Sequence, residues 1–154
     1  MKKRGLWWKI PTASLAVVLA AVLVYVCYAL LTYYRLEDWQ ELPVSGQGGG
    51  PAEKGQTYTL VSYNVGFGAY SPDYSFFMDG GEYSRALSEA AVAANVTGAL
   101  ETVTTQAPDF IFLQEMDIDA TRSYHVDEQA MAAQALGDGM AWVSAQNYDS
   151  PYLL

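Results

Sequence analysis

Cysteine and histidine are almost absent from this chain. Its 154 residues contain one of each, Cys27 and His125. A single cysteine excludes an intrachain disulfide. Two isolated residues of these types also give no Cys/His spacing of the kind that binds zinc. The sequence further lacks a nucleotide-binding glycine loop and a Ser-His-Asp arrangement for nucleophilic catalysis.

Charge is missing from one long stretch, residues 10–34, in which most positions are Ala, Val, Leu or Tyr. A helix rising ~1.5 Å per residue would cross the ~30 Å hydrocarbon core over this length. Basic residues precede the stretch, whereas only Arg35 follows it before a run of acids. The basic residues that precede it are Lys2, Lys3, Arg4 and Lys9. The positive-inside rule therefore predicts a cytoplasmic N-terminus and an extracytoplasmic remainder.

A cleaved signal peptide is the alternative to this anchor. It needs a shorter apolar region and small residues at the cut site, but the end of the stretch, residues 29–35, is bulky. Cys27 follows Val26, which disfavours a lipoprotein acceptor site, so we expect Cys27 to pack against lipid. We therefore predict a single-pass cell-membrane protein in which residues 1–35 form a cytoplasmic tip and an uncleaved anchor, with residues 10–34 in the lipid bilayer.

Basic residues are scarce after Arg35, where only Lys54, Arg85 and Arg122 occur against all 17 acidic residues, a net charge of −14. A surface this acidic repels polyanions, and non-specific DNA binding needs a basic footprint. The composition thus disfavours long nucleic acid as a substrate and leaves small phosphoesters or lipid headgroups. Alternatively, the acidity only keeps an exported domain soluble.

Residues 36–57 are glycine-rich around 45–51 and predict a flexible linker; residues 58–154 then form the domain. We expect strands at 58–64, 110–114 and 140–145, and helices at 82–106 and 126–136, the second ending at Gly137. The strand at 110–114 is apolar at nearly every position, which predicts cover on both faces. The first helix carries one apolar stripe, formed by Val92, Val96, Ala99 and Val103.

A loop over residues 66–81 is rich in aromatic side chains. They are Phe67, Tyr70, Tyr74, Phe76 and Phe77. So many aromatics in one loop indicate either a hydrophobic lid packed on the domain or a wall that faces lipid. Packing is the commoner explanation.

Two β-forming runs end in polar side chains: Asn64 after residues 60–63, and Gln114 with Glu115 after residues 110–113. A helical segment lies between them, so the runs can be neighbours in one sheet with their polar ends converging. Taken singly, Asn64 reads as a turn residue and Glu115 as a helix cap or surface acid. Taken together in this order, they predict a site.

These residues carry a family resemblance. Ser-Tyr-Asn-Val at 62–65, a helix, and then Pro-Asp-Phe-Ile-Phe-Leu-Gln-Glu at 108–115 resemble the start of an endonuclease/exonuclease/phosphatase domain. The resemblance covers about residues 58–148. It implies an α/β fold, here the N-terminal half of a four-layered α/β sandwich preceded by one transmembrane helix. It also implies hydrolysis of phosphate esters with a divalent metal.

By this resemblance Glu115 holds the metal, Mg²⁺ or Mn²⁺, and Asn64 lies beside it and orients the phosphate or the ligating carboxylate. Mg²⁺ suits such a site because it prefers hard oxygen ligands and keeps several waters. Many relatives carry a polar residue two positions after the Asn, where this chain has Gly66, so any contact from that position is absent.

Three further residues are weaker candidates for substrate binding. Arg85 and Arg122 suit bidentate contacts to a phosphate, but they are equally typical of solvated surface arginines. His125 suits a supporting donor or a substrate contact, although a residue at a helix start is the commoner interpretation. Asp117 and Asp119 are candidates for a cation beside Glu115, yet loop acids of this kind are usually solvated.

The family's later motifs, Asp-x-Asn and Ser-Asp-His, do not occur in this sequence. We therefore expect an N-terminal fragment of a longer, membrane-anchored, metal-dependent phosphoesterase, inactive by itself. The alternative is a non-catalytic, membrane-tethered binding domain that retains part of the fold. The sequence indicates no protein partner.

Overall fold

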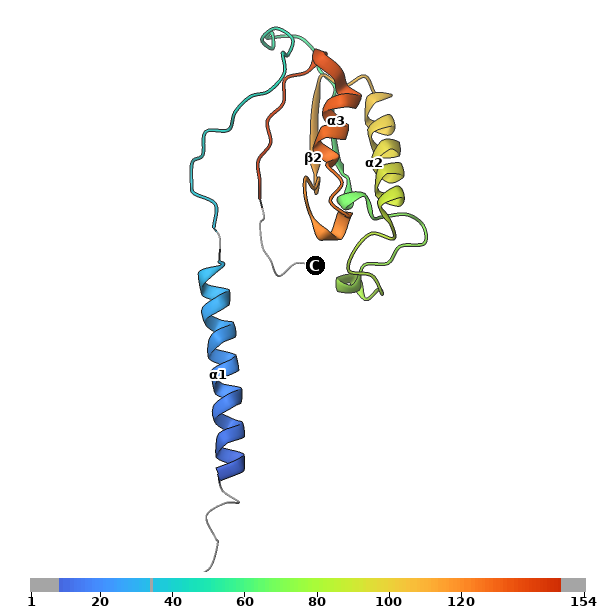
Figure 1. Ribbon diagram of the computed structural model, residues 1–154. Coiled ribbons are helices and arrows are strands. Elements are labelled where there is room, and N and C mark those ends of the chain that lie inside the picture. Colours follow the sequence, from blue (N-terminus) through green and yellow to red (C-terminus); the bar gives the residue numbers. More distant parts are fainter. Residues whose placement is uncertain (1–8, 34, 148–154) are drawn as a thin grey trace, which may run out of the picture. The chain divides into compact units, whose positions relative to one another are not determined.

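The structure is a computed structural model that describes residues 9–33 and 35–147. The described residues fall into two compact units (Figure 1). One contains the helix α1 (Lys9–Leu31), and the other, Glu41–Ala145, contains the sheet and the remaining helices. The basic residues 2–4 and the last residues of the expected domain, 148–154, lie outside the described part.

Helix α1 confirms the expected apolar helix. It is long and apolar enough to span a membrane, by length and composition, and none of its residues is buried. A helix that is apolar on all sides cannot be stabilised by packing one stripe on a core, and such helices belong in lipid or inside a large protein.

The described residues contain one sheet, of two parallel strands, β1 (Leu60–Asn64) and β2 (Phe110–Gln114). Leu60 lies opposite Phe110, and Asn64 lies opposite Gln114. Helix α2 (Glu89–Thr104) connects the two strands, which is the connection that parallel strands require. The second unit is therefore a mixed α/β arrangement, as the sequence predicts.

The core of the second unit forms around α2. Its predicted apolar stripe is buried, together with Leu100. This stripe packs against the residues that follow β1, chiefly Val65 and Phe67, and against Ala132 of α3 (Glu128–Leu136). Helix α3 agrees closely with the predicted helix and ends at Gly137, whose positive φ of 65° suits glycine at this position.

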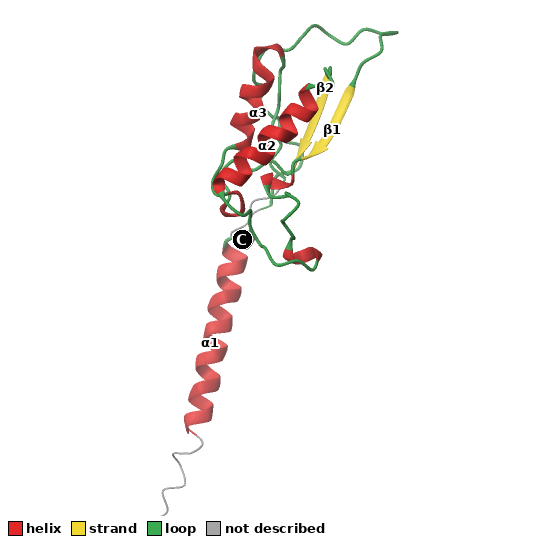
Figure 2. Ribbon diagram, turned by 90° about the vertical axis from the view of Figure 1, so that its right-hand side faces the viewer, coloured by secondary structure: helices red, strands yellow, loops and turns green. Residues whose placement is uncertain are grey.

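The expectation that β2 is covered on both faces is wrong for the described residues. Helix α2 packs on one face of the sheet, with α3 beside it (Figure 2). On the other face Leu60, Phe110 and Phe112 are exposed. Side chains of a strand alternate between faces, so one helical layer covers only Val61, Ile111 and their neighbours.

The predicted helix at 82–106 begins later than expected, at Glu89. The Ser88 hydroxyl accepts a hydrogen bond from the Ala91 amide at 3.1 Å and caps the helix. The preceding residues are held in other contacts: the Tyr83 amide bonds to the Ser75 carbonyl, and the Ala86 amide bonds to the Arg122 carbonyl. These bonds to residues outside the helix replace the helical ones that the Ala-rich pattern predicts.

The third predicted strand, at 140–145, is also wrong. Only Trp142 pairs, with Ser45, as an isolated antiparallel bridge. The pairing cannot continue along the partner segment, because Pro43 has no amide donor and Gly46 turns the chain with φ 75°. Ser45 lies within the predicted linker, and the second unit begins before it, at Glu41.

The aromatic loop after β1 divides into two parts. Phe67 and Tyr74 are buried in the core, and Phe76 packs against it. Tyr70 and Phe77 are exposed. The interpretation as a packed lid thus holds for Phe67, Tyr74 and Phe76. Tyr70 and Phe77 face outward instead.

Candidate functional site

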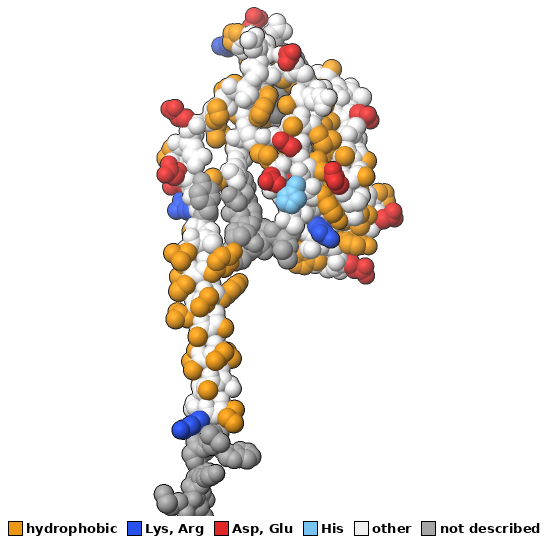
Figure 3. Space-filling model, in the orientation of Figure 1, with side chains coloured by type: hydrophobic (Ala, Val, Ile, Leu, Met, Phe, Trp, Pro, Cys, Tyr) orange, Lys and Arg blue, Asp and Glu red, His pale blue; other side chains and the backbone are white. Residues whose placement is uncertain are grey.

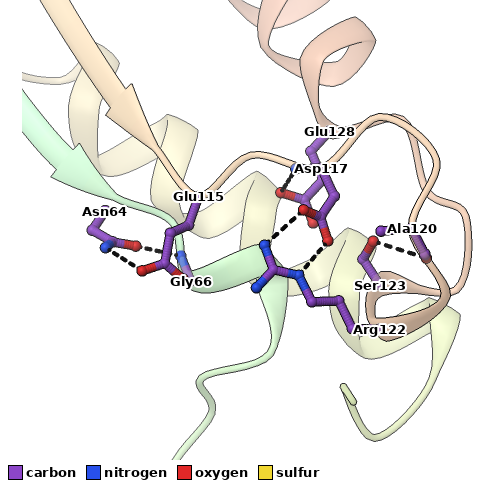
Figure 4. A network of polar contacts seen from close by, with 8 residues as sticks. All are labelled: Asn64, Gly66, Glu115, Asp117, Ala120, Arg122, Ser123 and Glu128. Carbon is purple, nitrogen blue, oxygen red and sulfur yellow. Dashed lines mark hydrogen bonds and ion pairs between the residues drawn. The ribbon is translucent and has the colours of Figure 1, made fainter. Parts of the chain in front are cut away.

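The carboxyl ends of β1 and β2 bring Asn64 and Glu115 together (Figure 4). The Asn64 Nδ2 donates to Glu115 Oε1 at 2.8 Å, and Asn64 Oδ1 accepts from the Gly66 amide at 2.8 Å. The backbone amide can only donate, which fixes the amide oxygen toward Gly66 and the amide nitrogen toward Glu115. The predicted convergence of these two side chains is therefore present.

The backbone is bent at the same point. Glu115 has φ 54° and Phe67 has φ 44°, values that are unusual for residues with a side chain. The bend is held by two bonds that extend the strand pairing: the Val65 amide donates to the Gln114 carbonyl, and the Phe67 amide donates to the Glu115 carbonyl at 2.8 Å. Unusual backbone of this kind concentrates at functional sites.

A shallow pocket of about 310 Å³ lies beside the pair. Its lining includes Tyr63, Asn64, Tyr70, Asn95 and Glu115. Partial burial, and then the charges of Asp79 and Glu115, raise the pKa of Tyr70, so its hydroxyl stays protonated at neutral pH. The pocket thus presents a carboxylate, amides and phenol groups.

The oxygen atoms at the carboxyl ends of β1 and β2 suit a divalent cation that is held by few protein ligands. Glu115 is exposed, and within the described residues no hydrogen bond reaches its Oε2. The described chain contains no group of three or more His, Cys, Asp or Glu side chains that could hold a metal. Mg²⁺ needs only one or two carboxylates when waters and substrate oxygens complete its shell. Glu115 suits the role of ligand, and Asn64 suits that of orienting the carboxylate.

Arg122 lies next to this edge but is already paired. Its Nε and Nη2 donate to the two oxygens of Asp117 at 2.9 and 2.8 Å, and its guanidinium stands 4.2 Å from the centre of the Phe67 ring. Burial alone would lower the pKa of Arg122, but the hydrogen bonds and charge of Asp117 outweigh it and raise the pKa. Arg122 thus makes to Asp117 the bidentate contact that it would otherwise offer a phosphate. The Asp117 side chain is largely buried, whereas the sequence suggests a solvated acid.

Sequence reasoning missed Glu128, a fully buried carboxyl behind this pair. Its Oε2 accepts from the Asp117 amide at 3.2 Å, and its Oε1 has no partner among the described residues. Burial raises the pKa of Glu128 to about 8. An acid just after the helix cap Asp127 is typical of any exposed first turn, so the sequence gives no sign of this burial.

The other two candidates, Arg85 and His125, do not line the pocket. The exposed Arg85 stands 5.2 Å from the centre of the Tyr124 ring. His125 pairs through Nδ1 with Asp119 on an exposed surface. Both contacts organise the segment after β2, where Tyr124 and His125 have positive φ values of 56° and 60°.

In comparisons with known proteins, no family model, no curated protein and no solved structure matches this chain significantly.

Proposed function

We propose that this chain belongs to a membrane-anchored, extracytoplasmic, metal-dependent phosphoesterase of the endonuclease/exonuclease/phosphatase type. The observation that carries the proposal is the bond between Asn64 and Glu115 at the adjoining ends of two parallel strands. The resemblance assigns these two positions to the metal site, and the fold brings them into contact from 51 residues apart in the chain.

The site's own residues would divide the work as follows. Glu115 supplies a carboxylate oxygen to Mg²⁺ or Mn²⁺, and Asn64 holds that carboxylate in place. A divalent cation in such a site neutralises phosphate charge and polarises the scissile bond. Tyr63 and Tyr70 flank the pocket and provide apolar ring surface with hydroxyl donors at their tips.

The open face of the sheet supports the family's larger fold. Leu60, Phe110 and Phe112 form an exposed apolar group there. In a four-layered sandwich this face is internal, because a second sheet packs on it. The assignment thus accounts for side chains that a two-stranded, one-layer arrangement leaves in water.

The substrate we propose is a lipid headgroup or a small phosphoester. Acidic side chains outnumber basic ones over the visible face of the second unit (Figure 3). A polyanion such as DNA would be repelled by this surface. A single phosphoester brings far less charge and reaches the cation without crossing an extended acidic surface.

Binding of Mn²⁺ to the detergent-solubilised full chain tests the metal site. Free Mn²⁺ is followed by electron paramagnetic resonance during titration. We expect Glu115→Gln to weaken the tightest site at least about tenfold, since a neutral amide is a poor ligand for a hard cation. The matched control is Glu101→Gln, an exposed acid on α2; equal affinity in both variants would refute the assignment.

A non-catalytic tethered binding domain is the second candidate. It is favoured by the pocket lining: among the described residues that form it, Glu115 is the single carboxylate and none is a histidine. Hydrolysis of bis-p-nitrophenyl phosphate with Mn²⁺, assayed for this chain and for a longer version that includes the downstream coding sequence, separates the two candidates. Turnover in the longer version that is lost in Glu115→Gln supports the enzyme, whereas metal binding without turnover in both versions supports the binding domain.

A further inference from the structure

The loop between β1 and α2 ends in an exposed apolar tip. Phe77 and Met78 begin the short 3-10 helix η2 (Phe77–Asp79), and their side chains are 48% and 67% exposed. Figure 2 shows η2 standing away from the rest of the second unit. Phe76, immediately before them, is partly buried and packs against the core, so the chain passes from half-buried to exposed within one residue.

Backbone hydrogen bonds and two glycines fix the conformation of this tip. The Phe77 amide donates to the Tyr83 carbonyl at 2.9 Å, and the Gly81 amide donates to the Phe76 carbonyl at 2.8 Å. Gly80 closes the turn with φ 86°, a conformation that favours glycine. A side chain at Gly81 would meet the Ser75 carbonyl carbon at 2.4 Å. The fold therefore holds two apolar side chains outward by a specific set of contacts.

The tip lies at the end of the second unit where the strands finish. Figure 2 shows β1 and β2 pointing toward the side on which η2 projects. Tyr70, from the same loop, lines the pocket that contains Asn64 and Glu115. A surface that bound the tip would thus face the proposed metal site.

A bilayer surface is the partner that the chain itself brings near. Residues 32–44 are all that connect α1 to Ser45, which already pairs within the second unit. If α1 spans the bilayer, this short tether keeps the tip at a high effective concentration near the membrane surface. Asp79 is exposed beside Met78, and the unit is strongly acidic, so an uncharged lipid surface suits it better than an anionic one.

We propose that Phe77 and Met78 insert into the interfacial region of a zwitterionic bilayer and so present the Asn64–Glu115 edge to lipid phosphoester headgroups. Burial of apolar side chains is favourable in proportion to the surface that they remove from water, and Phe is among the side chains that interfacial segments insert at the headgroup boundary. The insertion rests on the membrane anchor of the proposed function, and the statement about headgroups rests on its phosphoesterase activity.

Depth-dependent fluorescence quenching tests the insertion. The full chain carrying Cys27→Ser and Met78→Cys is labelled with a nitrobenzoxadiazole probe and reconstituted into phosphatidylcholine vesicles. Lipids with a nitroxide at a shallow acyl position act as the quencher. The matched control places the same label at Ala94→Cys, an exposed position on α2.

We expect quenching severalfold stronger at position 78 than at 94, and we expect Phe77→Asp to reduce it to the control level. Adding phosphatidylglycerol should weaken quenching, and high salt should restore it. Equal quenching at positions 78 and 94 overturns the proposal, whether or not Mn²⁺ binds Glu115. Strong quenching together with a failed Mn²⁺ titration keeps the membrane contact and removes the headgroup substrate.

Discussion

Arg122 and Asp117 form a two-pronged ion pair that closes the segment after β2 over the core. Both oxygens of Asp117 are used, at 2.8 and 2.9 Å, and the guanidinium also covers the ring of Phe67. One arginine therefore links the end of β2 to the loop that follows β1. The pair lies near Glu115 but makes no hydrogen bond to it (Figure 4).

Arg122→Lys should destabilise the second unit by about 2 kcal/mol, because an ammonium group cannot make both hydrogen bonds or stack on the ring. The measurement is urea unfolding of the detergent-solubilised full chain, followed by near-ultraviolet circular dichroism of its aromatic side chains. Arg85→Lys serves as the control, since the exposed Arg85 has one ring contact and should change stability by less than about 0.5 kcal/mol. Similar losses in both variants would show that the pair with Asp117 contributes little.

Glu128 should make the second unit less stable as pH rises. Its folded pKa of about 8 lies above the unfolded value near 4.5, so between these limits the folded state binds one more proton than the unfolded state. The contribution of Glu128 to the free energy of unfolding is then fully present below about pH 4.5. It falls by up to about 1.4 kcal/mol per pH unit until about pH 8. The charged neighbours of this carboxyl are Asp117, whose charge raises its pKa, and Arg122, whose charge lowers it.

Glu128→Gln should remove most of this slope, because the amide keeps an acceptor for the Asp117 amide and never ionises. Unfolding free energies at pH 5.5, 6.5 and 7.5 measure the slope in each variant. Glu101→Gln, at an exposed site on α2, should leave it unchanged. A slope that persists in Glu128→Gln would assign the proton uptake to another group.

Gly68 should tolerate no side chain. Its φ is 61°, and a Cβ there would stand 2.7 Å from Val92 Cγ1 and 3.0 Å from Val96 Cγ2. Both valines are fully buried, so neither can move away. We expect Gly68→Ala to cost about 2–4 kcal/mol of stability through strain and overpacking.

Gly98→Ala provides the matched comparison, with the opposite sign. Gly98 lies within α2, and a Cβ there meets nothing within 4 Å. Alanine should raise stability by about 0.5–1 kcal/mol, since glycine is a poor helix former. Thermal unfolding of the two variants in parallel distinguishes a steric effect at Gly68 from a general response to alanine.

The sequence predicts those strands and helices of the site that depend on short-range patterns in the chain. The apolar runs before Asn64 and Glu115 predict two strands, and the stripe from Val92 to Val103 predicts the helix between them. Parallel pairing follows, because one helix joins the strands. Chain order and periodicity therefore indicate that positions 64 and 115 can converge, and the family resemblance assigns the two residues to one site.

What the sequence does not predict depends on distant contacts. Glu128 looks like an ordinary acid in a first helical turn, but in the folded chain it is fully buried and accepts a hydrogen bond from the Asp117 amide. The late start of α2 depends on backbone bonds to Ser75 and Arg122. Trp142 lies in a β-forming run, but its partner at Ser45 is flanked by Pro43 and Gly46. In each case a tertiary contact overrides the local pattern.

The two asparagines of the pocket offer the sharpest test of how Glu115 is positioned. Asn64 Nδ2 donates to Glu115 Oε1 at 2.8 Å, whereas Asn95 Nδ2 donates to the Gly68 carbonyl at 2.8 Å. We expect Asn64→Ala to weaken Mn²⁺ binding by about 3–10-fold, less than Glu115→Gln, because groups that orient a metal ligand contribute less than the ligand itself. Asn95→Ala should reduce stability instead and leave Mn²⁺ affinity within about twofold, since its bond holds the loop rather than the carboxylate. Paired Mn²⁺ titration and urea unfolding measure both quantities for each variant. If the two asparagines affect Mn²⁺ affinity equally, the carboxylate is not oriented through Asn64, and the bond between strand ends is structural.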